Sequence, residues 1–162
     1  MTGEFRVGIG YDIHRLAEGR RLILGGIEIE HTKGLVGYSD ADVLLHAVID
    51  ALLGAAGLPD IGDLFPDTDP AFRDADSRDL LRDVVQRVRA KGFTPGNIDV
   101  IVHVETPKLS PHKAQIAESV ATLTELPADR VSIKAKTNEG LGPLGYTDAI
   151  ACTAAVSLTM SE

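Results

Sequence analysis

The most informative stretch of the chain is ADVLLHAVIDALLGAAGL, residues 41–58. Every residue in it is apolar or glycine except Asp42, His46 and Asp50, which follow one another at intervals of four. A helix that is apolar all round is normally buried, and residues four apart share one of its faces. The stretch therefore predicts a buried helix with one line of ionisable groups. Such groups must be paired or bound to something, unless the line is a partly exposed polar seam with one satisfied histidine.

The rest of the chain alternates between strand and helix patterns. Strands are expected at residues 5–14, 21–30, 97–105, 130–137 and 149–160, and helices at 39–56, 77–91 and 110–126. Ser39 and Ser110 are the expected N-caps of two helices, and Gly25-Gly26 suggests a bulge or bend inside the second strand. The last strand, for which a helix is the alternative, is expected to form a hairpin with residues 130–137. This order predicts one α/β domain of the α+β type over residues 1–162, with a mixed sheet and helices on one face.

Composition narrows the class of protein. The chain has 162 residues, 44% of them apolar and 25% charged, which is ordinary for a globular protein. The formal net charge of −8 argues against a nucleic-acid or anionic-membrane surface, since both attract clustered Lys and Arg. No apolar run is long enough to cross a bilayer, and the start, MTGEFRV, does not read as a signal peptide. The single Cys152 excludes internal disulfides and suggests the cytoplasm.

Two histidines and an aspartate suggest a metal site. Asp12 and His14 lie two apart in an expected strand, so they point to the same face with their Cα atoms about 6.6 Å apart. His46, on the buried helix, would add a third ligand. Two histidines, one carboxylate and an open position are a set that zinc uses when substrate or water must take the fourth place. The residues therefore suggest zinc at Asp12, His14 and His46.

Three other features of the sequence are weaker evidence for a function. The sequence GLGPLG at residues 140–145 has the spacing of a dinucleotide-binding loop, but Pro143 interrupts it and too few residues follow for a second strand. The acidic stretch DIGDLFPDTD, residues 60–69, lacks the pattern of a calcium loop and on its own reads as a solvated turn. Cys152 reads as a buried strand residue rather than a nucleophile.

Several of these segments together resemble one family. They are Asp12-Ile13-His14, residues 39–42 (SDAD) running into 46–53 (HAVIDALL), residues 60–70 (DIGDLFPDTDP), residues 107–112 (PKLSPH) and residues 134–142 (KAKTNEGLG). In order and spacing they resemble the 2-C-methyl-D-erythritol 2,4-cyclodiphosphate synthase family of the non-mevalonate isoprenoid pathway. The resemblance spans essentially the whole chain.

The resemblance implies an architecture and a reaction. It implies a homotrimer whose sheets pack around a threefold axis, with active sites between neighbouring subunits. It implies that Asp12, His14 and His46 hold zinc, and that Glu139 helps to hold a second divalent ion, magnesium or manganese, on a diphosphate. The implied substrate is 4-diphosphocytidyl-2-C-methyl-D-erythritol 2-phosphate, which closes to a cyclic diphosphate and expels CMP.

The resemblance also implies residue roles. Tyr38 and Thr137 would be catalytic, with Thr137 donating to the diphosphate. Two residues differ from the usual family pattern: Tyr38 stands in place of a histidine, and Tyr146 in place of an arginine that faces the trimer axis. Lys136 replaces a common threonine. The implied substrate-binding residues are Asp12, His14, Tyr38, Ser39, Asp60, Ile61, Gly62, Phe65, Pro66, Asp67, Thr68, Asp69, Val104, Glu105, Thr106, Pro107, Lys108, Leu109, Ser110, Lys136, Thr137, Asn138, Glu139, Pro143 and Tyr146. Asp42 and Asp50 are expected either to orient the metal histidine or to cap the helix.

Two other functions share these features. A zinc phosphoesterase that acts on a nucleotide diphosphate would use the same open metal site, but would release a linear phosphate. A non-catalytic trimer that binds metal or nucleotide is the second alternative, because Tyr38 replaces the usual histidine.

Overall fold

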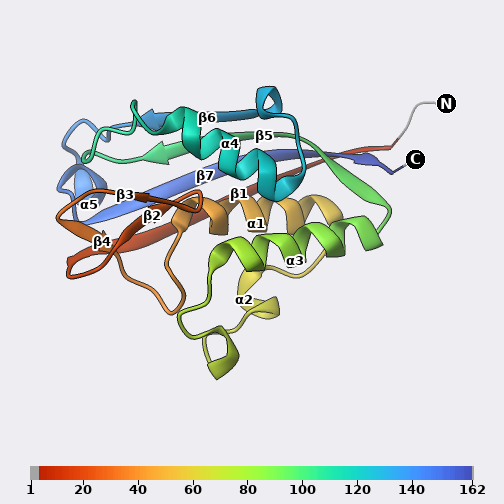
Figure 1. The fold of residues 1–162 in the computed structure, drawn as a ribbon, viewed down its shortest axis with the longest axis horizontal. Coiled ribbons are helices and arrows are strands. Elements are labelled where there is room, and N and C mark those ends of the chain that lie inside the picture. The colour runs from red at the N-terminus through yellow and green to blue at the C-terminus, as the bar shows by residue number, and fades with distance from the viewer. Residues whose placement is uncertain (1–3, 162) are drawn as a thin grey trace.

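The structure, a computed structural model, describes residues 4–161, which share one hydrophobic core (Figure 1). Residues 1–3 and 162 of the expected domain lie outside the described part. Within residues 4–161, every helix is too short or too polar to cross a lipid bilayer. In chain order the elements, including two short 3-10 helices labelled η, are β1 (Phe5–Glu18), β2 (Leu22–Leu24), β3 (Ile27–Ile29), β4 (Lys33–Leu35), α1 (Val43–Ala56), α2 (Ile61–Leu64), η1 (Pro70–Phe72), α3 (Ser77–Ala90), β5 (Phe93–His103), α4 (Lys113–Thr124), η2 (Ala128–Arg130), β6 (Val131–Lys136), α5 (Gly142–Gly145) and β7 (Ala149–Met160).

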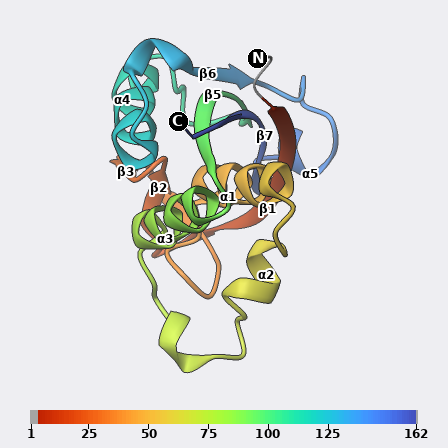
Figure 2. The same cartoon turned by 90° about the vertical axis from the view of Figure 1, so that its right-hand side faces the viewer.

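Five strands form a mixed sheet in the order β4-β1-β7-β5-β6. Strands β5 and β6 are parallel, and the other neighbouring pairs are antiparallel. A parallel pair needs a crossover connection, and α4 with η2 supplies it. Helix α1 packs on β1 and β7, α3 packs on α1, and α4 packs on β6, all from the same side of the sheet (Figure 2). The expected mixed sheet with helices on one face is therefore confirmed.

The last strand has different partners from those expected. Residues 149–160 do form a strand, β7, but it lies between β1 and β5 instead of forming a hairpin with residues 130–137. The segment between β6 and β7 contains α5 and is too long for a tight hairpin turn. β7 takes the centre of the sheet because its large side chains are buried; Ile150 and Cys152 have no exposed surface.

The second expected strand is in fact a separate hairpin. Strands β2 and β3 pair only with each other, and Gly25-Gly26 is the two-residue turn between them. Both glycines have positive φ, 64° and 76°, as a type I′ hairpin turn requires. The expected bulge or bend inside one strand is therefore a turn between two strands.

Two helix starts also differ from the expected ones. The N-cap of α1 is Asp42, whose carboxylate accepts a hydrogen bond from the Leu45 amide, and not Ser39. Helix α4 begins at Lys113, because residues 110–112 form a turn in which the carbonyl of Leu109 accepts two amides. The end of α1 is as expected, with Gly57 in the left-handed conformation.

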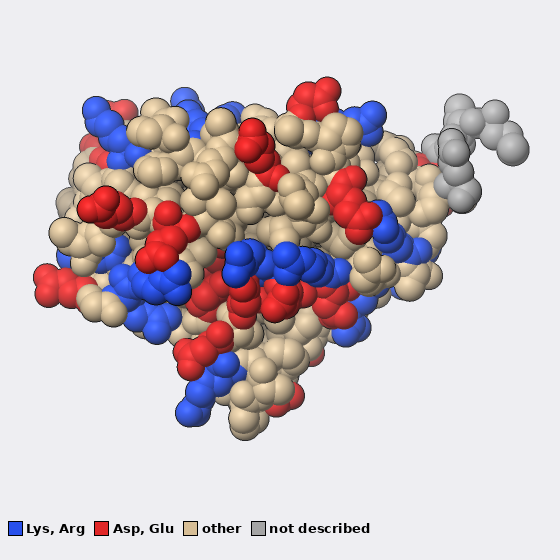
Figure 3. All heavy atoms as spheres, viewed as in Figure 1, with Lys and Arg blue, Asp and Glu red and all other residues tan. Residues whose placement is uncertain are grey.

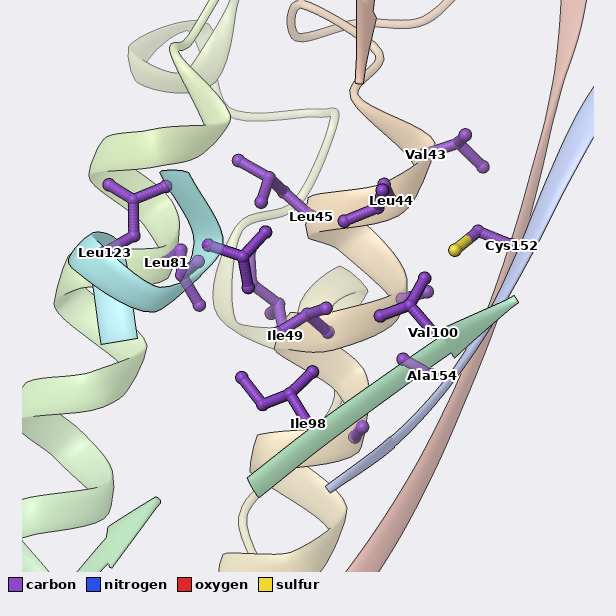
Figure 4. Packing of buried hydrophobic residues seen from close by; sticks show 14 of the residues in the cluster. Val43, Leu44, Leu45, Ile49, Leu81, Ile98, Val100, Leu123, Cys152 and Ala154 are labelled. Atoms are coloured by element: carbon purple, nitrogen blue, oxygen red, sulfur yellow. The ribbon is translucent and has the colours of Figure 1, made fainter. Parts of the chain in front are cut away.

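Helix α1 lies unusually close to β1. A Cβ atom on Gly8 would be 2.0 Å from the carbonyl oxygen of Ala51, and one on Gly10 would be 1.9 Å from that of Ala47. Only glycine allows this approach. Figure 4 shows the other side of α1, where Ile49 packs among residues of α3, β5 and β7. The helix is thus fixed on both sides, and the even-numbered residues of β1 face it.

The odd-numbered residues of β1 from 5 to 13 form an apolar stripe on the opposite face of the sheet. Their side chains are 45–74% exposed, although all are large and apolar. The residues of this stripe are Phe5, Val7, Ile9, Tyr11 and Ile13. A contiguous exposed apolar patch of this kind is typical of a surface that another protein covers.

Candidate metal centre

Asp12, His14 and His46 meet at one point between β1 and α1. Asp12 Oδ2 lies 2.9 Å from His14 Nε2 and 3.0 Å from His46 Nδ1, and the two nitrogens are 3.2 Å apart. Among residues 4–161 this is the group of three ligand side chains that could hold a metal ion. The structure therefore confirms that the three residues expected from the sequence come together.

The charge state of the group reflects its partial burial. Burial alone would raise the pKa of Asp12, but the hydrogen bonds from His14 and His46 outweigh it and hold that pKa far below its ordinary value. Burial alone would lower the pKa of His14, but the hydrogen bond and charge of Asp12 raise it above its ordinary value. Both shifts show a site that favours a cation next to the carboxylate.

The donor atoms suit a divalent transition ion. His14 Nδ1 lies 2.8 Å from the carbonyl oxygen of Val36, which can only accept, so Nδ1 carries the proton and Nε2 presents a lone pair. That lone pair and the carboxylate of Asp12 point at the same place. Two imidazole nitrogens and one carboxylate oxygen fit zinc or a similar ion with an open coordination position. The residues present therefore fit the metal that the resemblance implies.

The ligands line a cavity of about 450 Å³. This cavity is open to solvent. Eight of the residues expected to bind substrate line it: Asp12, His14, Tyr38, Ser39, Ile61, Gly62, Phe65 and Asp67. His46 lines it as well, together with three residues not predicted to do so, Gly37, Phe72 and Leu80.

The rim of the cavity is the segment from residue 60 to residue 72. Asp60 caps α2 by accepting the Asp63 amide at 2.9 Å, and Asp69 caps η1 by accepting the Ala71 amide at 2.9 Å. None of the residues of α2 or η1, all of them described, is buried. Asp60, Pro66, Thr68 and Asp69 thus shape the rim without lining the cavity.

Tyr38 connects the two sides of the cavity mouth. Its hydroxyl donates to the carbonyl oxygen of Asp69 at 3.2 Å, and the guanidinium of Arg73 lies 5.9 Å from the centre of its ring. Tyr38 therefore holds the loop before α1 against the rim.

The remaining expected site residues form a second cluster, away from this cavity. Glu105 accepts the Asn138 amide at 2.6 Å, and Thr137 donates to Glu139 at 3.4 Å. Val104 and Leu109 are buried. In the described part of the chain, none of residues 104–110, 136–139, 143 and 146 lines the metal cavity. A single chain therefore keeps the two groups of expected site residues apart.

Asp42 and Asp50 connect the elements around the site through hydrogen bonds to backbone amides. Asp42 accepts the amides of Gly25 and Gly26 in addition to its cap on α1, at 2.9 and 2.6 Å. Asp50 accepts the Ile61 amide at 2.9 Å and so joins α1 to the rim. Neither carboxylate hydrogen-bonds to His46. Of the two expected roles, orienting the histidine or capping the helix, Asp42 therefore has the capping role.

Two residues near His46, Ser77 and Asp40, were not among the site residues expected from the sequence, whereas Ser39 was. His46 Nε2 lies 2.9 Å from Ser77 Oγ and 3.2 Å from Ser39 Oγ, and Ser77 in turn contacts Asp40. Ser77 is separated from His46 by 31 residues and looks like an ordinary first residue of a helix. No local pattern marks it, and only the packing of α3 on α1 brings it to the site.

Three arginine side chains of α3 form ion pairs with aspartates close to them in the sequence. Arg78 with Asp76, Arg82 with Asp79 and Arg87 with Asp83 form ion pairs of 2.5–2.8 Å. On the face shown in Figure 3, basic and acidic side chains accordingly lie next to one another. The arginines of α3 are therefore neutralised locally.

Comparison with known proteins gives consistent matches over the whole chain. The model of the YgbB family matches residues 5–159. A protein of Bordetella petrii named 2-C-methyl-D-erythritol 2,4-cyclodiphosphate synthase is 59% identical over 162 residues, which is the full length of both chains.

Two solved structures are similar in fold. The bifunctional IspDF from Campylobacter jejuni matches with a TM-score of 0.95 and 41% identity, over 99% of this chain and 44% of that one. The structure described as an IspF (Plasmodium falciparum) CDP complex matches with a TM-score of 0.86 and 33% identity, over 100% of both chains.

Proposed function

The chain belongs to the YgbB family, whose curated relatives are 2-C-methyl-D-erythritol 2,4-cyclodiphosphate synthases, and from this premise we propose how it works. It is a phosphorus–oxygen lyase that converts 4-diphosphocytidyl-2-C-methyl-D-erythritol 2-phosphate into 2-C-methyl-D-erythritol 2,4-cyclodiphosphate and CMP. An oxygen of the 2-phosphate attacks the β-phosphorus, and the bond from that phosphorus to the oxygen shared with the α-phosphate breaks. CMP leaves with the shared oxygen, and no water is consumed.

The observation that carries this function is the group of Asp12, His14 and His46 at an open cavity. The nucleophile belongs to the substrate, so the protein must mainly position two phosphates and offset their charge. A chain of net charge −8 needs a cation for this. Zinc bound to these three residues supplies positive charge and a fixed direction for phosphate oxygens.

We assign the erythritol side of the substrate to the rim of the cavity. Ile61, Gly62 and Phe65 line the cavity and face the metal ligands across it. Asp60, Pro66, Asp67, Thr68 and Asp69 complete this segment. When substrate binds, the single hydroxyl proton of Tyr38 turns from the carbonyl oxygen of Asp69 to the phosphoryl group, in place of the histidine usual in the family.

We assign the cytidine side to the second cluster. Residues Val104, Glu105, Thr106, Pro107, Lys108, Leu109 and Ser110 form the cytidine pocket. Thr137 donates to the diphosphate as its charge changes, and Glu139 helps to hold a second divalent ion, magnesium or manganese, on it. Lys136, Asn138, Pro143 and Tyr146 lie next to these residues along the chain.

We propose that the two groups of site residues come from neighbouring subunits of a homotrimer. Two observations support this. The second cluster does not line the metal cavity of its own chain, and the apolar stripe of β1 is large enough to need a partner. Packing three sheets around a threefold axis would cover the stripe and bring the second cluster of one subunit to the metal cavity of the next.

The reaction itself is tested by phosphorus NMR of the purified enzyme with its substrate and magnesium. We expect a cyclic diphosphate and an equal amount of CMP, both lost when a chelator is added. Linear phosphates would instead show a zinc phosphoesterase. Binding of zinc and CMP without turnover would show a non-catalytic protein.

The shared site is tested by mixing two inactive variants, His46→Ala and Thr137→Ala. If each site combines the metal ligands of one subunit with Thr137 of the next, random mixing restores about a quarter of the sites. Mixing two His46→Ala preparations of different tag length is the control. No recovery in the mixed trimers would mean that each subunit holds a whole site.

We also propose that the enzyme works in the cytoplasm. Its single cysteine, Cys152, is a free and buried thiol whose pKa is raised by burial, as suits a chain with no disulfide to form. Cell fractionation with an antibody to the native protein tests this.

A further inference from the structure

The side of His46 that faces away from the metal position has its own chain of hydrogen bonds. His46 Nε2 lies 2.9 Å from Ser77 Oγ, and Ser77 Oγ lies 2.5 Å from Asp40 Oδ1. Asp40 Oδ2 accepts the backbone amide of Ser77 at 2.9 Å. Ser77 has no exposed surface, whereas Asp40 is partly exposed.

The protons of this chain can be counted. An ionised carboxylate only accepts, so the single hydroxyl proton of Ser77 points at Asp40. Ser77 Oγ then turns a lone pair toward His46. A bare Nε2 at 2.9 Å would face that lone pair and repel it, whereas a protonated Nε2 donates to it. The second neighbour, Ser39 Oγ, is farther away at 3.2 Å and can accept from the same N–H.

The consequence reaches the other ring nitrogen. A neutral imidazole carries one proton, so a proton on Nε2 leaves Nδ1 with a free lone pair. Nδ1 is the atom that lies 3.0 Å from Asp12 and 3.2 Å from His14. Without an ion the carboxylate of Asp12 attracts a proton to Nδ1, so the Nε2–H tautomer belongs to the metal-bound protein, in which the ion takes the place of that proton. His14 is held in a similar way: the carbonyl oxygen of Val36 keeps a proton on its Nδ1 and leaves its Nε2 as the atom for the ion.

We propose that Asp40 and Ser77 are positioning residues that hold His46 in the tautomer required for metal binding, with the proton on Nε2 and the lone pair of Nδ1 aimed at the ion. This inference rests on the proposed metal site. It assigns a role to the first residue of α3 and to the loop before α1, which hold His46 from outside the ligand set. Hydrogen bonds from such outer partners commonly contribute about 10–100-fold in metal affinity.

The sharpest variant is Asp40→Ala, which removes the acceptor of the Ser77 hydroxyl. Asparagine would not do this, because Asp40 Oδ1 also accepts the Asp42 amide at 3.2 Å and the oxygen of a side-chain amide would keep that position. In Asp40→Ala the hydroxyl proton of Ser77 is released toward His46 Nε2 and favours the opposite tautomer. We expect zinc affinity, measured by competition with a chelator, to fall about 10–100-fold.

The tautomer can be observed directly. In the zinc-loaded protein, nitrogen-15 NMR of the histidine side chains distinguishes Nε2–H from Nδ1–H. We expect Nε2–H for His46 in the wild type and a weaker Nε2–H signal in Asp40→Ala, because the released hydroxyl proton of Ser77 opposes it. An unchanged His46 tautomer together with unchanged zinc affinity would overturn the inference. Neither the tautomer nor the zinc affinity involves the substrate, so a failure of this inference can be told apart from a failure of the proposed synthase reaction.

A second variant separates the tautomer from simple loss of structure. Ser77→Ala removes the misdirected donor, so the double variant Asp40→Ala/Ser77→Ala should bind zinc more tightly than Asp40→Ala alone. A purely structural role predicts the reverse, a further loss from the second change. The matched control is Asp76→Ala, which removes a carboxylate at the N-cap of α3 without touching the Ser77 hydroxyl. An equal loss of zinc affinity in that control would also overturn the inference.

Discussion

At the scale of single residues, the metal centre depends on two glycines as much as on its ligands. Gly8 and Gly10 face α1 from the same side of β1 as Asp12 and His14. They let the carbonyl groups of α1 approach to a distance at which no side chain fits. His46, which extends from α1, therefore reaches the two ligands of the strand.

Replacing Gly10 with alanine should move the helix. The added methyl group would lie 1.9 Å from the Ala47 carbonyl oxygen, and backbone cannot yield as a flexible side chain can. We expect a loss of about 1–3 kcal/mol in the free energy of unfolding, with weaker zinc binding. Urea denaturation and chelator competition measure the two effects. The control is Gly54→Ala, on the exposed face of α1 with open space around it, which should stabilise by about 0.5–1 kcal/mol. Equal behaviour of the two variants would contradict this account.

The pair of Asp12 and His14 predicts a pH dependence of the zinc-free protein. Because the pKa of Asp12 is lowered in the folded protein, its ionised form stabilises the fold at pH values above the ordinary pKa of 3.8. This stabilisation is lost as the pH falls through the folded pKa. Because the pKa of His14 is raised in the folded protein, its protonated form stabilises the fold fully at pH values below the ordinary pKa of 6.5. This stabilisation is lost as the pH rises through the folded pKa. The pair therefore stabilises most between these two ordinary values.

Unfolding of zinc-free wild type and Asp12→Asn at a series of pH values tests this. The advantage of the wild type should shrink as pH rises above the ordinary value for His14, 6.5. Zinc binding should show the opposite trend and strengthen, because the ion displaces the proton of His14. A constant difference between the two proteins across this range would rule out the pair as the source.

At the scale of elements, the hairpin of β2 and β3 is joined to α1 through one buried carboxylate. Asp42 has no exposed surface and accepts three amides, those of Gly25, Gly26 and Leu45. Burial raises the pKa of Asp42 to about 6, while these amides act to lower it. The turn of the hairpin and the start of the helix thus share one acceptor.

Removing that acceptor should loosen the hairpin before it unfolds the domain. Asp42→Ala leaves buried amides without a partner, and we expect a loss of about 2–4 kcal/mol in the free energy of unfolding. Hydrogen exchange at Gly25 and Gly26 should accelerate more than exchange in β7. Asp76→Ala, which removes a cap with one amide from α3, is the control and should cost about 1 kcal/mol. Unchanged exchange at the two glycines would disprove the connection.

What the sequence could predict at this scale followed from local patterns. Period and end signals located α1, α3 and β7, because a helix or strand shows its buried face within a few residues. The pairing of β7 could not be predicted, since alternation marks a strand and says nothing of its neighbours. The same limit applies at the site. Asp12, His14 and His46 stand out by spacing on their own elements, whereas Ser77 reaches His46 only through the packing of α3 on α1.

At the scale of the whole molecule, the uncovered face of the sheet is the main feature that one chain does not explain. The stripe of β1 exposes Ile9 by 74% and Val7 by 69%, next to a strand that is buried in the core. Helices cover the other face of the sheet, so an isolated subunit would expose this apolar surface to water.

A charge placed in the stripe should separate the subunits. We expect Ile9→Glu to sediment as a monomer, because a carboxylate cannot be buried without a partner. The monomer should still bind zinc, since one chain holds all three ligands, but should lose turnover if a neighbour completes the site. Gln86→Glu on the exposed face of α3 is the control and should remain assembled and active. A fully active Ile9→Glu monomer would refute the shared site.

The cavity joins two kinds of structure, and this has a consequence for turnover. Its metal ligands lie on β1 and on the largely buried helix α1, while α2 and η1 on its rim bury none of their residues. Segments with few buried contacts open at a much lower free energy than the core. We therefore expect the rim to open for product release without unfolding of the core. Metal affinity should follow the packing of α1 on β1, which positions the ligands, whereas turnover should follow the opening of the rim.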